Sequence, residues 1–295
     1  MKCLFTGSAV ALITPFKNGA IDYDSLGKLI DFQLENGTDA IVVLGTTGEP
    51  ATIKDVDKKE IIEFAKKRVN GKAKLIVGTG ANSTRKAVEN SVMAKESGAD
   101  GLLVVTPYYN KCTNLGLYEH YKAIADGVKL PIIVYNVPGR TGVNITPQMA
   151  LKLSEIPEVV GIKEASGNIS QIVELASALE GKMALYSGDD ALNYAFMCLG
   201  AQGAISVTAN VLPQKVKQLL DFCQNKNYEK ARSLHQELLE INKTMFVEVN
   251  PVPIKYACHL LGLCSSEIRL PLTPPEEEHK ELIKKALSKF YNLQQ

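Results

Sequence analysis

The sequence predicts a closed (β/α)₈ barrel followed by a C-terminal helical domain. Three observations support this fold: eight short apolar runs, helix-like segments between them, and a change to helical segments alone after residue 207. Strands and helices that alternate with short connections form right-handed βαβ units and a parallel sheet. Eight such units in about 210 residues fit a closed barrel better than an open doubly wound sheet, which is the alternative.

The predicted strands are runs rich in Val, Ile, Leu and Ala. Such continuous apolar runs are typical of parallel strands that are buried on both faces. The runs cover residues 9–13, 40–44, 74–77, 101–105, 131–135, 159–163, 183–186 and 203–207. The sixth run is unusual because it ends in a charged residue, Lys163.

Segments with the spacing of helices separate these runs. The first has apolar residues from Leu26 to Leu34, and Gly37 ends it as a C-cap glycine would. The next segments cover residues 56–69, 88–94, 118–128, 147–156, 169–179 and 191–199. Each therefore predicts a helix that connects two strands of the barrel.

The last part of the chain is predicted to be helical throughout. Pro213 starts one stretch, residues 228–246 and 253–261 continue it, and Pro274 precedes an acidic segment that suits the start of a final helix. We therefore predict a barrel domain over residues 1–212, which carries the active site, and a helical domain over residues 213–295.

Composition excludes several classes of protein. With 45% hydrophobic and 22% charged residues, the 295-residue chain is typical of a soluble globular protein. A net charge of +1 gives no reason to expect binding to nucleic acid or to a membrane. There is no apolar run near the roughly 18 residues of a membrane-spanning helix, and we expect no signal peptide. Six scattered cysteines without a CxxC pair favour reduced thiols. We expect a cytoplasmic protein.

Lys163 is the first candidate for chemistry. In a barrel, the residues that follow each strand gather around one mouth, and Lys163 ends the sixth strand. An amine that is partly removed from water loses its proton more easily, so it could attack a carbonyl. Taken alone, however, a lysine at a strand end is more often a solvent-facing residue.

Four other loops place polar groups at the same mouth. Gly45-Thr46-Thr47-Gly48-Glu49 offers backbone N–H groups and two hydroxyls to a carboxylate or phosphate, although it could be an ordinary turn. Thr106-Pro107-Tyr108-Tyr109-Asn110 contributes two phenols, which could relay protons or anchor an interface. Tyr135 ends the fifth strand, and Arg140 after it could bind a carboxylate or form a surface ion pair. In Ser187-Gly188-Asp189-Asp190, either aspartate could be a helix N-cap. Together these groups suit a carbonyl substrate that bears carboxylates and an imine on Lys163.

Two other kinds of site are disfavoured. Gly78-Thr79-Gly80-Ala81-Asn82-Ser83 lacks the third glycine of a dinucleotide-binding loop, and the acidic residue Asp100 precedes its strand instead of ending it. The four histidines do not have the spacing of zinc ligands, so no metal is predicted.

With these motifs in place, the chain resembles the dihydrodipicolinate synthase/N-acetylneuraminate lyase family of pyruvate-dependent class I aldolases. The resemblance runs from the segment 11–16 to the segment 250–255 and rests on the loops above together with Gly161-Ile162-Lys163-Glu164-Ala165. It implies a (β/α)₈ barrel with a C-terminal helical domain, and a homotetramer made of two tight dimers. It is strongest to the members that condense pyruvate with L-aspartate 4-semialdehyde in the biosynthesis of lysine and diaminopimelate.

The resemblance also implies the role of each residue. Lys163 forms an imine with pyruvate, and Tyr135, Thr46 and Tyr109 relay protons, with Tyr109 supplied by the neighbouring subunit. The predicted substrate-binding residues are Thr46 and Thr47 for the pyruvate carboxylate, Arg140 for the semialdehyde carboxylate, and the backbone of Gly188 and Ile205. The imine is covalent, so the reaction needs no cofactor.

One departure from the family concerns regulation. Members that lysine inhibits often carry two histidines after the glycine-threonine loop and a glutamate in a later helix. The matching residues here are Asp55, Lys58 and Lys86. Two cationic side chains would repel a lysine ammonium and the glutamate is missing, so we expect weak or absent inhibition by lysine.

Two competing functions remain open at this point. One is a related aldolase, such as N-acetylneuraminate lyase or a keto-deoxy-sugar acid aldolase, which Arg140 and the threonine pair disfavour because polyol substrates need more neutral partners. The other is a barrel that binds a small acid without catalysis. Binding alone would require neither Lys163 nor Tyr135.

Overall fold

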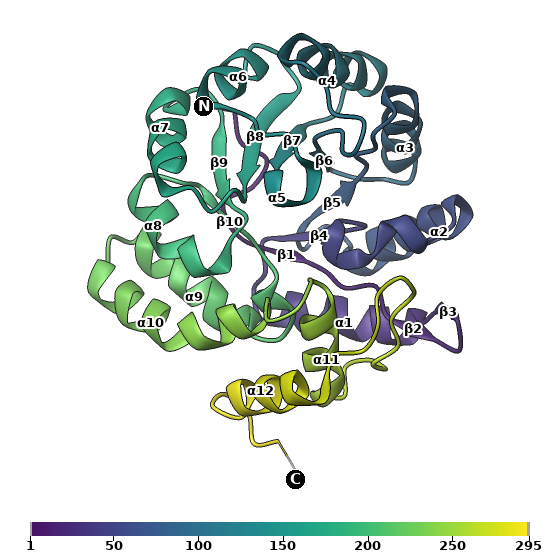
Figure 1. Ribbon diagram of the computed structural model, residues 1–295, viewed down its shortest axis with the longest axis vertical. Helices are drawn as coiled ribbons and strands as arrows, with labels where there is room; N and C mark the ends of the chain where they lie inside the picture. The colour runs from purple at the N-terminus through teal and green to yellow at the C-terminus, as the bar shows by residue number, and fades with distance from the viewer. Residues whose placement is uncertain (1, 294–295) are drawn as a thin grey trace.

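Eight parallel strands close into a barrel in the computed structural model, which describes residues 2–293 (Figure 1). Around the barrel the strand order is β1-β10-β9-β8-β7-β6-β5-β4, and β1 pairs with both β10 and β4. This closure confirms the predicted barrel and rules out the open sheet. The strands are β1 (Gly7–Ala11), β4 (Ala40–Val43), β5 (Lys74–Gly78), β6 (Gly101–Val105), β7 (Ile132–Asn136), β8 (Val159–Glu164), β9 (Ala184–Ser187) and β10 (Gly203–Ser206).

The connecting helices lie around the outside of the barrel, and they agree with the predicted segments to within a few residues. They are α1 (Tyr23–Glu35), α2 (Asp55–Val69), α3 (Thr84–Glu96), α4 (Asn114–Val128), α6 (Pro147–Leu153), α7 (Ile169–Leu179) and α8 (Asn193–Cys198). Gly37 after α1 has a φ of +76°, which fits the predicted helix end.

Some short elements were not predicted. The strands β2 (Phe16–Lys17) and β3 (Ala20–Ile21) form a hairpin, and α5 (Pro138–Thr141) is a single helical turn. Two-residue strands and a single turn are too short to show a periodic pattern. The hairpin does carry a local signal, because its turn is Asn18-Gly19 and both residues have positive φ.

The C-terminal helices pack together on one side of the barrel, in the green and yellow part of Figure 1. They are α9 (Pro213–Gln224), α10 (Tyr228–Thr244), α11 (Val252–Leu260) and α12 (Glu277–Leu287). Helix α9 contacts the closing strands β1 and β10 as well as α10, while α12 contacts α10 and α11. Within residues 2–293, none of the helices combines the length and apolar character needed to cross a membrane.

Alternation along the strands divides the buried residues into two cores. Ala9, Val42, Ile133 and Tyr186 belong to a small cluster inside the barrel. Their strand neighbours, such as Val10 and Ile41, belong to the larger cluster between strands and helices. Successive side chains of a strand point to opposite faces, so a charged residue at a strand end faces either the barrel axis or the helices.

His120 on α4 is buried as a neutral base, and this predicts a pH dependence of stability. Burial lowers its pKa from 6.5 to about 4, and its Nδ1 lies 3.0 Å from Thr84 Oγ1. Because the pKa is lower in the folded state, the folded protein is favoured above pH 6.5, and this contribution is lost as protons bind the unfolded chain below that pH. By pH 5 the loss is about 2 kcal/mol.

This loss can be measured by urea titration at pH 7.5 and at pH 5. His120→Asn removes the titrating group and keeps an amide near Thr84, so its free energy of unfolding is expected to fall by less than that of the wild type. If the free energy of unfolding fell equally for both proteins between pH 7.5 and pH 5, His120 would not be the source of the loss.

Candidate active site

Lys163 and Tyr135 lie side by side at the C-terminal ends of β8 and β7. They are register partners, so both side chains point into the barrel. The Lys163 Nζ atom lies 4.5 Å from the centroid of the Tyr135 ring. Lys163 is only 4% exposed and Tyr135 only 7%. The structure therefore places the predicted nucleophile inside the barrel, away from bulk water.

Burial lowers the pKa of Lys163 to about 8, which is the main effect. Asp190 raises the pKa and the Arg140 guanidinium lowers it further. At pH 7, roughly one Lys163 amine in ten is then unprotonated, compared with fewer than roughly one in a thousand for an ordinary lysine. The predicted activation of the amine by desolvation agrees with this environment.

For Tyr135 the pKa moves in the other direction: burial raises the pKa of its phenol, so the phenol keeps its proton. Arg140 and the neighbouring Thr46 hydroxyl lower it, while Glu164 raises it. A phenol next to a hydroxyl and an amine can pass a proton in either direction. The structure thus brings Lys163, Tyr135 and Thr46 together as the sequence predicted.

The glycine-threonine loop after β4 forms two short 3₁₀ turns, Thr46–Gly48 and Pro50–Thr52. Thr47 is 2% exposed, and its Oγ1 accepts a hydrogen bond of 3.0 Å from Nδ2 of Asn250. At the end of the loop, Glu49 accepts a hydrogen bond of 2.5 Å from Lys255 Nζ. The loop therefore has a fixed conformation, held from the C-terminal part of the chain.

Arg140 lies on α5 at the mouth of the barrel and is exposed. Its Nη2 donates to the backbone oxygen of Asn250 at 2.9 Å. One residue, Asn250, thus contacts both a predicted pyruvate-binding hydroxyl and the predicted semialdehyde-binding guanidinium. Asn250 was part of a motif that indicated the family, but nothing in the spacing of the sequence indicated this contact.

Gly188 directly follows β9, and Ile205 lies within β10, one residue before its end. Ile205 is 1% exposed and belongs to the cluster inside the barrel. A Cβ atom at Gly188 would lie 2.9 Å from Lys163 Cε and 2.8 Å from Ala165 Cβ. No side chain fits at position 188 unless both Lys163 and Ala165 move.

Gly188→Ala is therefore expected to lower kcat/KM for pyruvate in the predicted reaction by about 10-fold to 100-fold. The added methyl group would displace Lys163, and small displacements of a reacting group are costly. Gly27→Ala in α1 is the control: its Cβ would make only ordinary contacts of 3.5 Å or more. Steady-state kinetics of both variants test the prediction. Wild-type kcat/KM in a folded Gly188→Ala protein would contradict it.

Tyr109 is the predicted residue that the structure does not bring to Lys163. It is 91% exposed, and its φ of +70° is unusual for an aromatic residue. An exposed, constrained phenol cannot reach the site of its own chain without a rearrangement of the loop. Its supply to a neighbouring subunit remains a prediction.

A cavity of about 590 Å³ opens at this mouth. Thr46, Tyr135, Arg140 and Asn250 line one part of it, and Lys58 and Lys86 line another. Lys163 is not part of its surface, since Tyr135 forms the wall next to the amine. Tyr135 therefore lies between the cavity, which it lines, and the Lys163 amine, which contacts its ring.

The two aspartates after β9 have different roles. Asp189 is the N-cap of the 3₁₀ turn Asp190–Leu192, and its Oδ1 accepts from the backbone N–H of Ala191. Asp190 is buried and its Oδ2 accepts from the backbone N–H groups of Val207 and Thr208. Asp190 thus holds the loop after β10 and places a negative charge near Lys163. Sequence alone gave no means of distinguishing the pair.

Metal ligation finds no support in the part of the chain that the structure describes. No group of three or more His, Cys, Asp or Glu residues among residues 2–293 could hold a metal ion. The prediction that the reaction uses no cofactor stays a prediction.

Comparison with known proteins identifies the family. A sequence model described as the dihydrodipicolinate synthetase family matches residues 4–290. The chain belongs to this family. A 4-hydroxy-tetrahydrodipicolinate synthase of Citrifermentans bemidjiense is 50% identical over 290 residues, which are 98% of this chain and 100% of the relative.

Solved structures of the dihydrodipicolinate synthetase family match the fold over almost the whole chain. The dihydrodipicolinate synthase of Aquifex aeolicus is 48% identical, with a TM-score of 0.95 over 98% of this chain and 99% of the other. A chloride-inhibited enzyme from Acinetobacter baumannii, solved with pyruvate, is 46% identical, with a TM-score of 0.94 over 96% of this chain and 98% of the other. The family resemblance seen in the sequence is confirmed.

Proposed function

We propose that this protein is a 4-hydroxy-tetrahydrodipicolinate synthase, which condenses pyruvate with L-aspartate 4-semialdehyde through an imine on Lys163. The observation that carries the proposal is the buried Lys163 amine, with a pKa of about 8, beside the Tyr135 ring at the mouth of the barrel. An amine with these properties is a nucleophile for a ketone at neutral pH. Family membership and the names of the relatives support the same reaction.

The proposed sequence of steps follows from the positions of these groups. The free amine of Lys163 adds to the ketone of pyruvate, and loss of water gives the imine. Removal of a methyl proton gives the enamine, whose carbon attacks the aldehyde of the semialdehyde. The amino group of the second substrate then closes the ring onto the imine carbon and releases Lys163. Tyr135 and Thr46 carry the protons that these steps release and consume.

The remaining residues act in binding. Thr47, with Thr46, binds the pyruvate carboxylate, and the backbone of Gly188 and Ile205 contacts the bound substrate. Arg140, the guanidinium at the mouth, binds the semialdehyde carboxylate, for which its planar fork is well suited. Tyr109 enters the site of a neighbouring subunit in a homotetramer, and its 91% exposure in the single chain supports this part of the proposal.

The test is intact mass spectrometry after incubation with pyruvate and borohydride, combined with assays of the second substrate. We expect one trapped adduct per chain, together with faster consumption of aspartate semialdehyde than cleavage of sialic acid. The reverse order of rates would assign a different aldolase activity. No adduct would remove the imine mechanism and favour a barrel that only binds a small acid.

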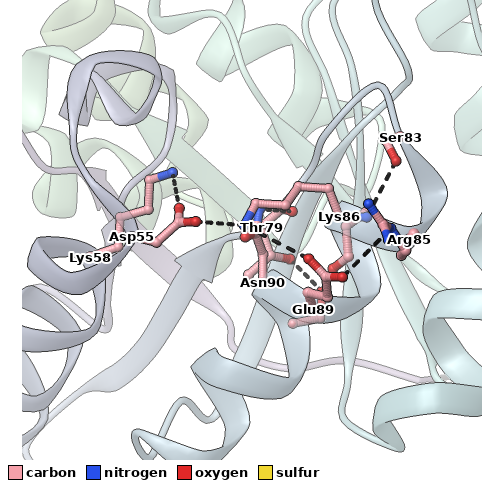
Figure 2. Close-up of polar contacts among 10 residues, drawn as sticks. Asp55, Lys58, Thr79, Ser83, Arg85, Lys86, Glu89 and Asn90 are labelled. Atoms are coloured by element: carbon pink, nitrogen blue, oxygen red, sulfur yellow. Dashed lines mark hydrogen bonds and ion pairs between the residues drawn. The ribbon is translucent and has the colours of Figure 1, made fainter.

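The part of the cavity that Lys58 and Lys86 line predicts weak inhibition by lysine. Asp55 accepts from Lys58 at 3.1 Å and from Lys86 at 2.6 Å, as Figure 2 shows, and both lysines lower the pKa of Asp55. Glu89 lies 3.9 Å from Lys86. The repulsion expected from the sequence is therefore weaker in the structure, because the charges compensate. Each Asp55 oxygen already accepts from a lysine, so a lysine ammonium would have to share this carboxylate with two other cations.

We expect an inhibition constant for lysine above about 1 mM, from initial rates measured with rising lysine concentration. Asp55→Ala should not strengthen inhibition, since it leaves two cations behind. A sub-millimolar inhibition constant for the wild type would refute the prediction.

A further inference from the structure

Glu164, the residue after Lys163, is a buried carboxylate that the proposed mechanism does not use. It is 0% exposed. Its side chain contacts residues on β7 and α7 and a loop N–H, so it lies outside the barrel wall, opposite to Lys163. Among the described residues, no Lys, Arg or His forms an ion pair with it. A buried charge without a countercharge needs another source of stabilisation.

Three hydrogen-bond donors provide that stabilisation. Oε1 accepts from the backbone N–H of Ser166 at 2.6 Å, and Oε2 accepts from Asn136 Nδ2 at 2.8 Å and from Gln171 Nε2 at 3.2 Å. Every partner donates, so the ionised carboxylate fits the site. A glutamine at position 164 has the same size, but its NH₂ group would face one of these N–H donors in either orientation of the amide.

The register of the strands connects this network to the active site. Tyr135 pairs with Lys163, and the next pair along the same two strands is Asn136 with Glu164. The first pair faces the barrel axis, and the second faces the helices. The hydrogen bond from Asn136 to Glu164 therefore joins the ends of β7 and β8, one residue beyond Tyr135 and Lys163.

Asn136 is itself fixed on its other side. Its Oδ1 accepts from the backbone N–H of Ile145 at 2.8 Å, and it is 0% exposed. Glu164 is also tied to the next strand end, because its backbone oxygen accepts from Gly188 N at 2.8 Å. The ends of β7, β8 and the loop after β9 are thus linked through one residue.

We propose that Glu164, together with Asn136, is a positioning residue that sets the placement of Lys163 against Tyr135 for imine formation. The inference rests on the proposed function. Glu164 does not touch the substrate. It acts by holding two strand ends that would otherwise be joined only by backbone hydrogen bonds.

The experiment measures how fast pyruvate forms the imine, by borohydride quenching at timed intervals followed by intact mass. Glu164→Gln keeps the size of the side chain and breaks the donor pattern, so the rate should fall at least 10-fold with unchanged circular dichroism. Thr46 and Thr47, which bind the pyruvate carboxylate, are unchanged in this variant. The fold decrease in kcat should therefore be larger than the fold increase in KM for pyruvate. Glu158→Gln is the matched control, because it makes the same chemical change directly before the first residue of β8, far from Lys163. There Glu158 forms an ion pair with the exposed Lys129. Its rate should equal that of the wild type.

A complementary double variant tests the geometry directly. In Asn136→Asp/Glu164→Gln, the new carboxylate at position 136 can accept from the new amide at position 164, while Ser166 N still finds an oxygen. Asn144 now accepts from Asn136, and Gln171 now donates to Glu164. Both of these amides must turn over in the double variant, so that each donor again meets an acceptor. We expect the trapping rate to return to within about threefold of the wild type, whereas Asn136→Asp alone sets two carboxylates together and should be slow. If Glu164→Gln does not fold, the double variant carries the test.

The outcomes separate the two hypotheses. A wild-type protein that forms no adduct refutes the proposed function itself. A wild-type adduct with an undiminished rate in folded Glu164→Gln overturns the positioning role alone. A folded double variant that remains 10-fold slow overturns it as well, because complementary hydrogen bonding would then not determine the rate.

Discussion

Lys163→Met is expected to lower kcat by at least about 10⁴-fold and to abolish the borohydride-trapped pyruvate adduct. Methionine fills a similar volume but has no nucleophile, and no other group in the site can form the imine. The fold should persist. The unfolding temperature at pH 7 should equal or exceed that of the wild type, because an amine whose folded pKa is about 8 is less favourably charged in the folded protein than in the unfolded chain.

Intact mass and differential scanning fluorimetry on the same samples test both parts. The natural control is the other buried lysine, Lys255, which stays in place and should remain unlabelled. The pH dependence of the wild type provides a further check: the rate of adduct formation should rise through about pH 8 as the Lys163 amine loses its proton. An adduct on the Lys163→Met variant at the wild-type rate would move the chemistry to another residue.

Lys255→Met is expected to lower the free energy of unfolding by about 3–5 kcal/mol. Lys255 and Glu49 form an ion pair of 2.5 Å, with side chains only 1% and 3% exposed. Lys255 also lies 3.9 Å above the Phe16 ring. Desolvation lowers its pKa despite the carboxylate, so the pair is held in an apolar setting. Removing the lysine leaves Glu49 with one contact of 3.3 Å to the Arg269 N–H.

Urea titration of the single variants and of Glu49→Gln/Lys255→Met tests this. Removing both charges should recover most of the loss, since paired burial itself contributes little net stability. Lys122→Ala is the control, because its pair with Asp126 is exposed to water and should contribute little to the free energy of unfolding. A loss below about 1 kcal/mol for Lys255→Met would show that water reaches Glu49. The kcat/KM of the double variant would show whether Thr46 and Thr47 need the charge on Glu49 for their proposed roles.

The sequence was sufficient for the barrel because each strand is a local apolar run and each helix has its own period. It also indicated Lys163, Tyr135 and Thr46, because residues at strand ends meet at one mouth in any barrel of this kind. These inferences need only local patterns and one general rule of topology.

What the sequence did not reveal depends on contacts between distant segments. Asn250 meets Thr47 across 203 positions, and Lys255 meets Glu49 across 206. No periodicity links such positions. The sequence shows Glu164 only as part of a motif, since burial of a carboxylate outside the barrel depends on Asn136 and Gln171 being near. The contact between Lys86 and Asp55, which reduces the positive charge expected at this position, likewise joins two separate helices.

The link between Glu49 and Lys255 also bears on how the protein is made. All eight strands have left the ribosome once Ser206 has emerged, yet the carboxylate on the loop after the second of them still lacks its cation. That cation is encoded about 50 codons later, so the glycine-threonine loop reaches its final shape only near the end of translation. A chain that terminates early would contain every proposed catalytic side chain and still leave Glu49 without its partner. Such fragments should be inactive and readily degraded, because they keep a buried carboxylate without its countercharge.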